Sequence, residues 1–371
     1  MRTSRSLRIG TALAAIALLA VLGAAFLATI GIDALEMRNE YQFFDSSSTY
    51  HEVARGNLDL ESLGDVISIS GNFLGPLMIV RLAGDNYYVV LVLNAALLAF
   101  SVASLARSLR LDAPKFLLVL LLDPISVSSV LSVNKEILAV AMIALLVRFY
   151  TARSVPALVL AILTSVLVRW QMTMLLLLTL ALLSPLNPIR GRRVATIAVV
   201  LAALSLAYFL LEETLAPIRL NFQDAAAEYE GSGLYELLVN LQDQGWYWAI
   251  FPLKAAHLLF GNGLRFDRLI APTNWYGDVW QLLHSTSLLV LFLVLVRRGR
   301  FTPKNDLVYL SLIYIAVFAI TPIYTPRYFY PVYVFWAAAL CTRDPLSPIF
   351  ARRPTLRARR RPAQLAPVPA R

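Results

Sequence analysis

The first long apolar stretch of the chain, IGTALAAIALLAVLGAAFLATIGI, runs from Ile9 to Ile32 without a charged residue. It follows three arginines, Arg2, Arg5 and Arg8. An uncharged apolar run of about 18 residues or more is typical of a transmembrane helix, whereas the apolar part of a cleaved signal peptide is about 7–15 residues long. The sequence therefore predicts that this stretch is an uncleaved first membrane span.

The composition of the whole chain extends this prediction. Of its 371 residues, 58% are hydrophobic and only 15% are charged, and the mean hydropathy is +0.66. Soluble domains are nearer half apolar and a quarter charged. We therefore expect an all-α polytopic membrane protein with about ten transmembrane helices. The expected spans cover residues 9–32, 86–106, 116–133, 136–150, 155–168, 171–186, 194–214, 276–296, 306–323 and 328–342.

The distribution of charge predicts the orientation of these spans. With the N-terminus inside, the cytoplasmic segments hold 23 of the 33 Lys and Arg residues but only three of the 23 acids. Such an excess of basic residues on one side is the positive-inside pattern. We expect a multi-pass protein of the plasma (inner) membrane with both termini cytoplasmic. The basic tail 343–371 is expected to be disordered and to lie near anionic lipids, with no nucleic-acid partner.

The spans form a single membrane domain, 1–342, with two long outer loops, 33–85 and 212–275. The first loop ends in GNFLGPLMIVRLAG, whose apolar part is too short to span and is expected to be interfacial or re-entrant. The second contains GWYWAIFPLKAAHLLF, 245–260, whose dense Trp and Tyr favour an amphipathic helix in the headgroup layer. An eleventh span broken at Pro252 is the alternative, but it would put the C-terminus outside.

The most polar stretch of the first outer loop is YQFFDSSSTYHEVARG, Tyr41 to Gly56. Asp45 and the three serines after it form a helix N-cap pattern, which predicts a surface helix over 46–55. Asp45 either only caps that helix or is an exposed carboxylate that takes a proton from a hydroxyl. His51 and Glu52 lie one to two turns further and could support that chemistry, although solvated or packed side chains explain them as well.

A second group of candidate residues lies in DPISVSSVLSVNKE, 123–136. Asp123 falls inside an expected span, where an ionisable group usually has a function, and Pro124 frees backbone carbonyls beside it. Lys135 and Glu136 are expected at the outer mouth of the spans. Lys135 is either a phosphate contact or a side chain that extends to the membrane interface.

Two arginines are expected on the outer side, where basic residues are few. Arg169 joins two short apolar runs, and Arg327 lies between two prolines in TPIYTPRYFYP, followed by Tyr328. A planar guanidinium suits a phosphate, and aromatic rings can stack on sugars. The alternatives are an Arg169 side chain that only reaches the interface and a belt of interfacial aromatic residues around Arg327.

Signatures of soluble enzymes are missing from the sequence. It contains no phosphate-binding glycine loop, no HExxH and no nucleophile elbow. The single cysteine, Cys341, excludes an intramolecular disulfide and a cysteine-based metal cluster. With three histidines in total, a histidine-built metal site is not expected, and the sequence implies no cofactor.

Together these stretches resemble the multi-span glycosyltransferases of the GT-C fold and the related polymerases and ligases of surface polysaccharides. The resemblance covers 1–342 as a layout. It rests on the acid in the first outer loop before a Tyr-containing surface helix, the GNFLGPLMIVRLAGDN run, the Pro124 and Lys135–Glu136 pattern, an Arg between short spans and the late PRYFYP. Asp45 is followed by serines rather than a second acid, and no large soluble domain follows the last span. The latter departure favours the polymerase branch.

The resemblance implies transfer of a sugar from a polyprenyl-phosphate-linked donor to a glycan, lipid or protein acceptor outside the membrane, in synthesis of the cell envelope. It implies Asp45 as the base, and Lys135, Arg169, Arg327 and Tyr328 as phosphate or sugar contacts. His51, Glu52, Asp123 and Glu136 would support them, and the requirement for a divalent metal stays open. A lipid or solute transporter, with Asp123 as a proton relay, is the alternative from another class.

Overall fold

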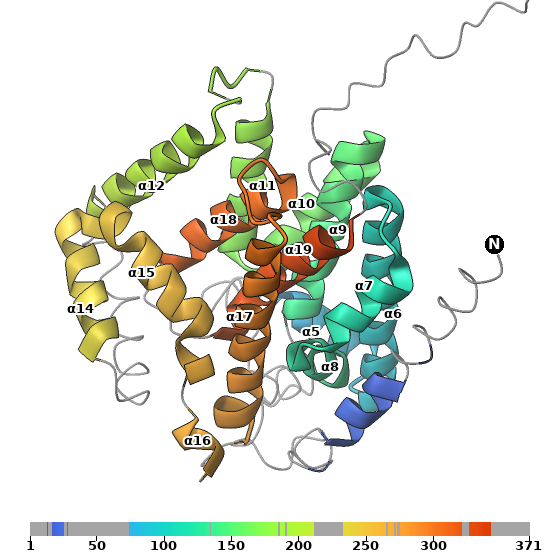
Figure 1. The fold of residues 1–371 in the computed structure, drawn as a ribbon. Coiled ribbons are helices and arrows are strands. Elements are labelled where there is room, and N and C mark those ends of the chain that lie inside the picture. Colours follow the sequence, from blue (N-terminus) through green and yellow to red (C-terminus); the bar gives the residue numbers. More distant parts are fainter. Residues whose placement is uncertain are drawn as a thin grey trace, which may run out of the picture.

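The computed structural model describes residues 13, 17–25, 28, 74–133, 135–184, 186–189, 191–210, 233–264, 266–270, 272, 275–320 and 326–342. All regular structure within these ranges is helical, so the all-α class is confirmed (Figure 1). The polar stretch Tyr41–Gly56, with Asp45, His51 and Glu52, lies outside the described residues. So do most of the expected first span and the basic tail 343–371.

Within the residues that the structure describes, three helical segments are long and apolar enough to cross a membrane. They are α6 (Tyr87–Leu109), α12 (Arg193–Leu210) and Asp278–Arg297, which includes α17 (Gln281–Arg297). Each coincides with an expected span. A fourth is added only if the bent pair α7 and α8 counts as one span. The prediction of about ten transmembrane helices is therefore wrong for the described part of the chain.

The physical reason is helix length. Five of the other expected spans form shorter helices. A helix of about 14 residues extends only about 21 Å, against about 30 Å for the hydrocarbon core of a bilayer. Turns and extended residues interrupt the apolar sequence before a full crossing is complete. These shorter helices are α9 (Glu136–Ala152), α10 (Val155–Val168), α11 (Trp170–Leu183), α18 (Asp306–Ala319) and α19 (Tyr330–Cys341).

The expected continuous span over 116–133 is also corrected. The chain forms α7 (Ala113–Leu121) and α8 (Pro124–Leu131), which meet at an angle of 87°. Asp123 caps α8, and its carboxylate accepts a hydrogen bond of 2.9 Å from the backbone N–H of Ile125. Pro124 occupies the first turn, where its missing N–H and fixed φ favour a new helix over continuation of the old one.

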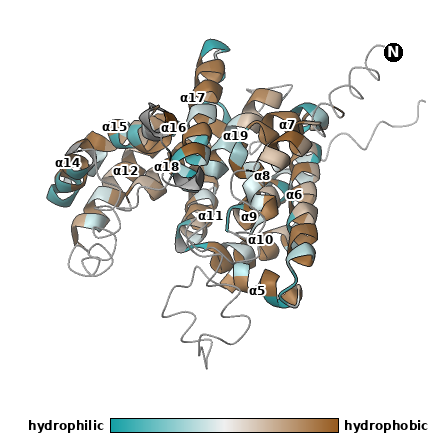
Figure 2. Cartoon of the chain, turned by 90° about the horizontal axis from the view of Figure 1, so that it is seen from below, coloured by the Kyte–Doolittle hydropathy of each residue, from teal (hydrophilic) through white to brown (hydrophobic). Residues whose placement is uncertain are grey.

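The helices α18 and α19 form the centre of the molecule. Nearly all their residues are buried, and α7, α9, α11, α15 (Tyr247–Phe260) and α17 pack around them. Helices on the outside expose apolar side chains instead, among them Val92, Leu163 and Leu206. Figure 2 shows this hydrophobic colouring along α6 and α10. An apolar exterior of this kind fits a lipid environment.

Several short helices complete the fold. The nine-residue α5 (Leu74–Leu82) packs against α10 so closely that a Cβ on Gly75 would lie 2.5 Å from the carbonyl oxygen of Leu167. Only glycine fits at that contact. The remaining elements are α14 (Gly233–Leu241), the π-helical η2 (Gln242–Trp246), the 3₁₀ helix η3 (Gly261–Leu264), α16 (Asp267–Ile270), the π-helical η4 (Trp275–Trp280) and the 3₁₀ helix η5 (Pro326–Phe329).

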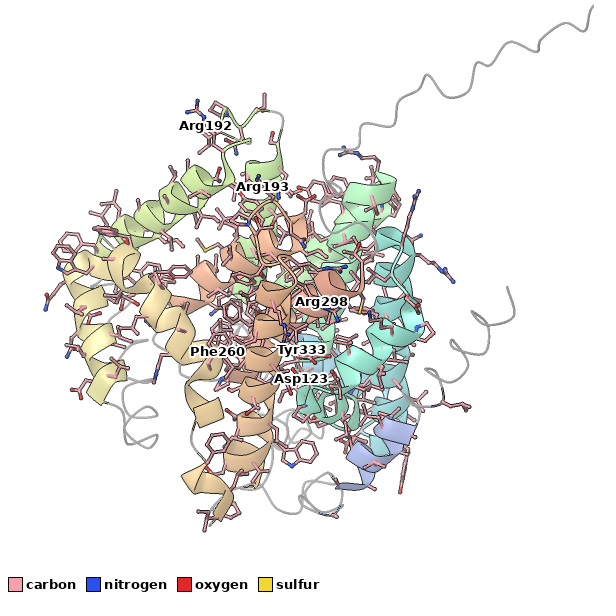
Figure 3. The ribbon with its side chains drawn as sticks, viewed as in Figure 1. Asp123, Arg192, Arg193, Phe260, Arg298 and Tyr333 are labelled. Carbon is pink, nitrogen blue, oxygen red and sulfur yellow. The ribbon has the colours of Figure 1, made fainter. Side chains whose placement is uncertain are left out.

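Basic side chains gather where several helices begin or end, a region called the basic end below. At this end Arg193 of α12 pairs with Asp306 of α18, and Arg300 donates a hydrogen bond of 2.7 Å to the carbonyl oxygen of Leu340 in α19. Figure 3 places Arg192 and Arg193 here, opposite α8 and α16. Lys304 lies here too, since its carbonyl oxygen accepts a hydrogen bond of 3.0 Å from Arg193, and Arg297 and Arg298 end α17 just before Arg300. The turn between α9 and α10, which contains Arg153, lies at the same end (Figure 1).

Candidate functional site

The candidate site begins with a buried ion pair. Glu136 is the first residue of α9, and Arg169 lies in extended backbone between α10 and α11. The guanidinium donates a hydrogen bond of 2.9 Å to the carboxylate. The break at Arg169 matters, because α10 ends and α11 begins there and the residue belongs to neither helix. The N-terminus of α9 also favours the negative charge of Glu136.

Arg169 and Arg327 lie on the same aromatic ring. The guanidinium carbon of Arg169 is 3.8 Å from the ring centroid of Tyr328, and that of Arg327 is 5.6 Å away. Both distances fall within the range of a cation–π contact. The backbone of this segment is held in turn, because the Tyr314 hydroxyl donates a hydrogen bond of 2.6 Å to the carbonyl oxygen of Tyr328. We call Glu136, Arg169, Arg327 and Tyr328 the arginine–tyrosine cluster.

The cluster lies away from the basic end. Glu136 begins α9, whose last residue precedes Arg153, and Arg169 follows α10, which starts after Arg153. The segment η5 lies between the end of α18 and the start of α19, whose other ends meet Arg193 and Arg300. Each element thus brings its cluster residue to the end opposite the basic end.

Four of the residues selected from the sequence are therefore brought together, although they come from three separate parts of the chain. Arg169 is only 5% exposed and is paired with Glu136, which disfavours the alternative of a side chain that only reaches the membrane interface. Arg327 is 6% exposed and belongs to the short 3₁₀ helix η5. Lys135 precedes Glu136 as the half-buried N-cap residue of α9, without a side-chain cap bond.

A second buried polar group adjoins the cluster through η5. The Asp123 carboxylate lies 2.7 Å from Nδ1 of His284, and Nε2 of the same ring lies 3.1 Å from the carbonyl oxygen of Pro326. Both side chains are fully buried. Figure 3 shows Asp123 in the interior beside Tyr333. Asp123 was expected inside a continuous span as an ionisable group with a function. It lies instead at the bend between α7 and α8, where Oδ1 accepts from the Ile125 N–H and Oδ2 contacts His284.

The neighbours of His284 define how many protons this group holds. Pro326 offers a carbonyl oxygen, which only accepts, so Nε2 must carry a proton. One further proton lies between Nδ1 and the carboxylate. The pair is therefore neutral as a whole, either as imidazolium with carboxylate or as imidazole with carboxylic acid. Because both ring nitrogens are occupied, His284 does not present a free nitrogen to a substrate in this conformation.

Separate hydrogen bonds join the same helices near this pair. The Tyr330 hydroxyl lies 2.8 Å from Oγ of Ser126, and the Tyr333 hydroxyl donates a bond of 2.7 Å to the carbonyl oxygen of Val119. These contacts connect the start of α19 with α7 and α8. The broken helix is thus held at its bend by polar contacts from two other helices, α17 and α19.

Sequence reasoning missed a third buried polar group, around Lys254. Its ammonium donates to the Gln242 side chain, which donates in turn a bond of 2.6 Å to the carbonyl oxygen of Ile320. Burial lowers the pKa of Lys254 from 10.5 to about 7, an effect that Asp243 partly opposes. The helix α15 is continuous through Pro252 and is not among the segments long enough to span a membrane.

His284 was also missed, although the sequence held a signal for it. An ionisable residue within an apolar run is rarely there without a partner, and His284 lies inside the expected span 276–296. Lys254 gave the same signal in a helix assigned to the membrane surface.

Within the described ranges, His, Cys, Asp and Glu side chains form no group of three that could hold a metal ion. Compared with known protein families, curated proteins and solved structures, the chain shows no match in any of the three.

Proposed function

We propose that this protein is a membrane glycosyltransferase that transfers a sugar or glycan from a polyprenyl-phosphate-linked donor at the extracytoplasmic face. One observation carries the proposal. Two almost fully buried arginines, Arg169 and Arg327, flank the ring of Tyr328 at the end of the molecule opposite the basic end. This arrangement provides positive charge and an aromatic surface in one place, which a sugar linked to a phosphate requires.

The charge of the cluster favours an anion. Two guanidinium groups and one carboxylate leave one positive charge among its ionised side chains. Within the described part of the chain, one N–H of Arg169 is bound to Glu136, so other donors of this guanidinium are available to a phosphate oxygen. Arginine binds phosphate through paired N–H groups, and burial strengthens such a contact relative to water.

The apolar exterior and the charge distribution support the remaining parts of the proposal. Exposed apolar residues on α6 and α10 fit the bilayer that would hold a polyprenyl tail. If the basic end faces the cytoplasm, as the positive-inside pattern favours, the arginine–tyrosine cluster faces outward. We propose Arg169, Arg327, Tyr328 and Lys135 as donor contacts, with Glu136 orienting Arg169. Asp45 is the proposed base and lies outside the described residues.

Two related activities are compatible with the same cluster. Transfer of one sugar and polymerisation of repeat units of a surface polysaccharide use the same kind of lipid-linked donor. A transporter is favoured by a different observation, the fully buried Asp123–His284 pair within candidate membrane segments, where ionisable groups often relay protons. Variants of Asp123 separate this alternative from the others.

The test is binding and transfer with purified protein in lipid nanodiscs. A radiolabelled sugar on a polyprenyl phosphate serves as donor, and transfer to a membrane extract of the native cells is measured. Arg327→Gln is expected to weaken donor binding about ten- to a hundredfold, because one contact to a charged group is lost. The matched control is Arg298→Gln, which removes an exposed arginine at the basic end and should leave binding unchanged. Equal donor binding by both variants would refute the proposal.

A further inference from the structure

The segment that carries Arg327 and Tyr328 is short and needs external support. The 3₁₀ helix η5 contains only four residues, Pro326–Phe329, and lies between α18 and α19. A single 3₁₀ turn has poor hydrogen-bond geometry of its own. The position of the two cluster side chains therefore depends on what holds this turn in place.

Contacts from three helices hold the turn and the residue after it. His284 of α17 binds the carbonyl oxygen of Pro326, Tyr314 of α18 binds that of Tyr328, and Ser126 of α8 contacts the Tyr330 hydroxyl. The first of these contacts is unusual, because the histidine is itself fixed by a buried carboxylate. Asp123 comes from the bend between α7 and α8, 161 residues away from His284 in the chain.

We propose that Asp123 and His284 act as a positioning pair that fixes η5, and with it the Arg327 guanidinium and the Tyr328 ring, at the anion-binding site. The anion-binding part rests on the function proposed above. The pair reaches the site through the Pro326 carbonyl oxygen, one residue before Arg327. Asp123 orients the imidazole from Nδ1, and the imidazole then holds the turn from Nε2. Neither residue transfers a proton to substrate in this role.

A positioning role predicts that Asp123→Asn keeps the function of the pair. In Asp123→Asn the amide oxygen still accepts from the Ile125 N–H, while the amide N–H donates to Nδ1 of a neutral imidazole. The Nε2–H remains on the Pro326 carbonyl oxygen. Every hydrogen bond of the pair is thus preserved and only its extra proton is lost. A proton relay would fail in this variant, whereas a positioning pair would not.

A substitution of His284 by phenylalanine has the opposite effect, because it keeps a ring at this position and removes the hydrogen bonds of the imidazole. In His284→Phe the ring still fills its site, but Asp123 and the Pro326 carbonyl oxygen both lose their hydrogen bond to the imidazole. The turn then loses its contact with α17. If this variant does not give folded protein, Asp123→Ala replaces it. That variant leaves the imidazole without its orienting carboxylate and is expected to have the same effect in weaker form.

The experiment measures two quantities in the full chain in detergent. The first is amide hydrogen exchange of the peptide that covers 326–330, and the second is affinity for farnesyl phosphate, a short polyprenyl phosphate. We expect His284→Phe to speed exchange of this peptide at least about tenfold and to weaken farnesyl phosphate binding about tenfold, since each follows from loss of one buried hydrogen bond. Asp123→Asn should match the unaltered protein in both.

Unchanged exchange in His284→Phe, or exchange in Asp123→Asn as fast as in His284→Phe, would overturn the positioning role. If the unaltered protein does not bind farnesyl phosphate, the proposed function fails instead. The exchange measurement then still decides whether the pair fixes η5, so the two failures are distinguishable.

Discussion

Glu136 and Arg169 form an ion pair of 2.9 Å in which both side chains are buried, although 33 residues separate them in the chain. The pair connects the start of α9 with the break between α10 and α11. A buried ion pair often adds little to stability, because the attraction is offset by the loss of hydration. Its value here is geometric, because Glu136 directs the Arg169 guanidinium onto the Tyr328 ring.

A double-mutant cycle tests this interpretation. Arg169→Met and Glu136→Leu are each expected to reduce the free energy of unfolding by about 3–5 kcal/mol, since each leaves a buried charge without its partner. The double variant should recover most of that loss, because neither charge remains. Its donor binding should still be weakened about ten- to a hundredfold, because the Arg169 contact is absent. Urea unfolding in detergent measures the stability, with Arg298→Met at the exposed basic end as control. A double variant no more stable than the single ones would contradict the expectation.

The orientation of the molecule can be tested with cysteine labelling. Cys341 is buried and can first be replaced by alanine. Glu236→Cys, on an exposed position of α14, should react with a membrane-impermeant maleimide in intact cells. Lys304→Cys, exposed at the basic end, should react only after the membrane is opened. The reverse result would move the arginine–tyrosine cluster to the cytoplasmic face and end the proposal of an extracytoplasmic activity.

Lys254 predicts a dependence of stability on pH. Its pKa is about 7 in the folded protein and near 10.5 when unfolded, so between these values the unfolded chain binds more protons. The free energy of unfolding should therefore rise with pH from about 7 to 10.5 and be independent of this group below pH 7. In Lys254→Met this rise should be absent. Melting temperatures at pH 7 and pH 9 measure the difference, and parallel changes in both proteins would show that the lysine keeps its ordinary pKa.

Many helix boundaries could be predicted because they depend on sequence signals within a few residues of the boundary. The expected segment 155–168 is α10 to the residue, since Ser154 caps it and Pro156 fits its first turn. The prediction of a continuous span over 116–133 was wrong because the mean hydropathy of a long window does not show the break at Asp123 and Pro124. Asp123 followed by Pro124 is a strong start signal for a new helix, and a window about 19 residues wide does not detect it.

The site was predictable only in part, because contacts between distant segments depend on packing. Arg169 and Arg327 could be selected as arginines on the side with few basic residues. That both would lie on the ring of Tyr328 could not, since this requires the break after α10 and the turn before α19 to meet. For His284, the position in an apolar run could be read from the sequence, but its pairing with Asp123 could not.

Asp45 remains the proposed base, and its two interpretations, base and helix cap, predict different results for the same variants. Asparagine caps a helix about as well as aspartate, so Asp45→Asn should insert and fold normally under both interpretations. If Asp45 is the base, turnover should fall about 10²- to 10⁴-fold while donor binding persists, because the amide does not take up the acceptor's proton. If it is only a cap, Asp45→Asn should remain active, and Asp45→Ala should lower the free energy of unfolding by about 0.5–2 kcal/mol. Transfer rates and unfolding in detergent, measured for both variants, distinguish these results. An active Asp45→Asn variant would reject the catalytic role and direct attention to Glu52, the other acid of the same stretch.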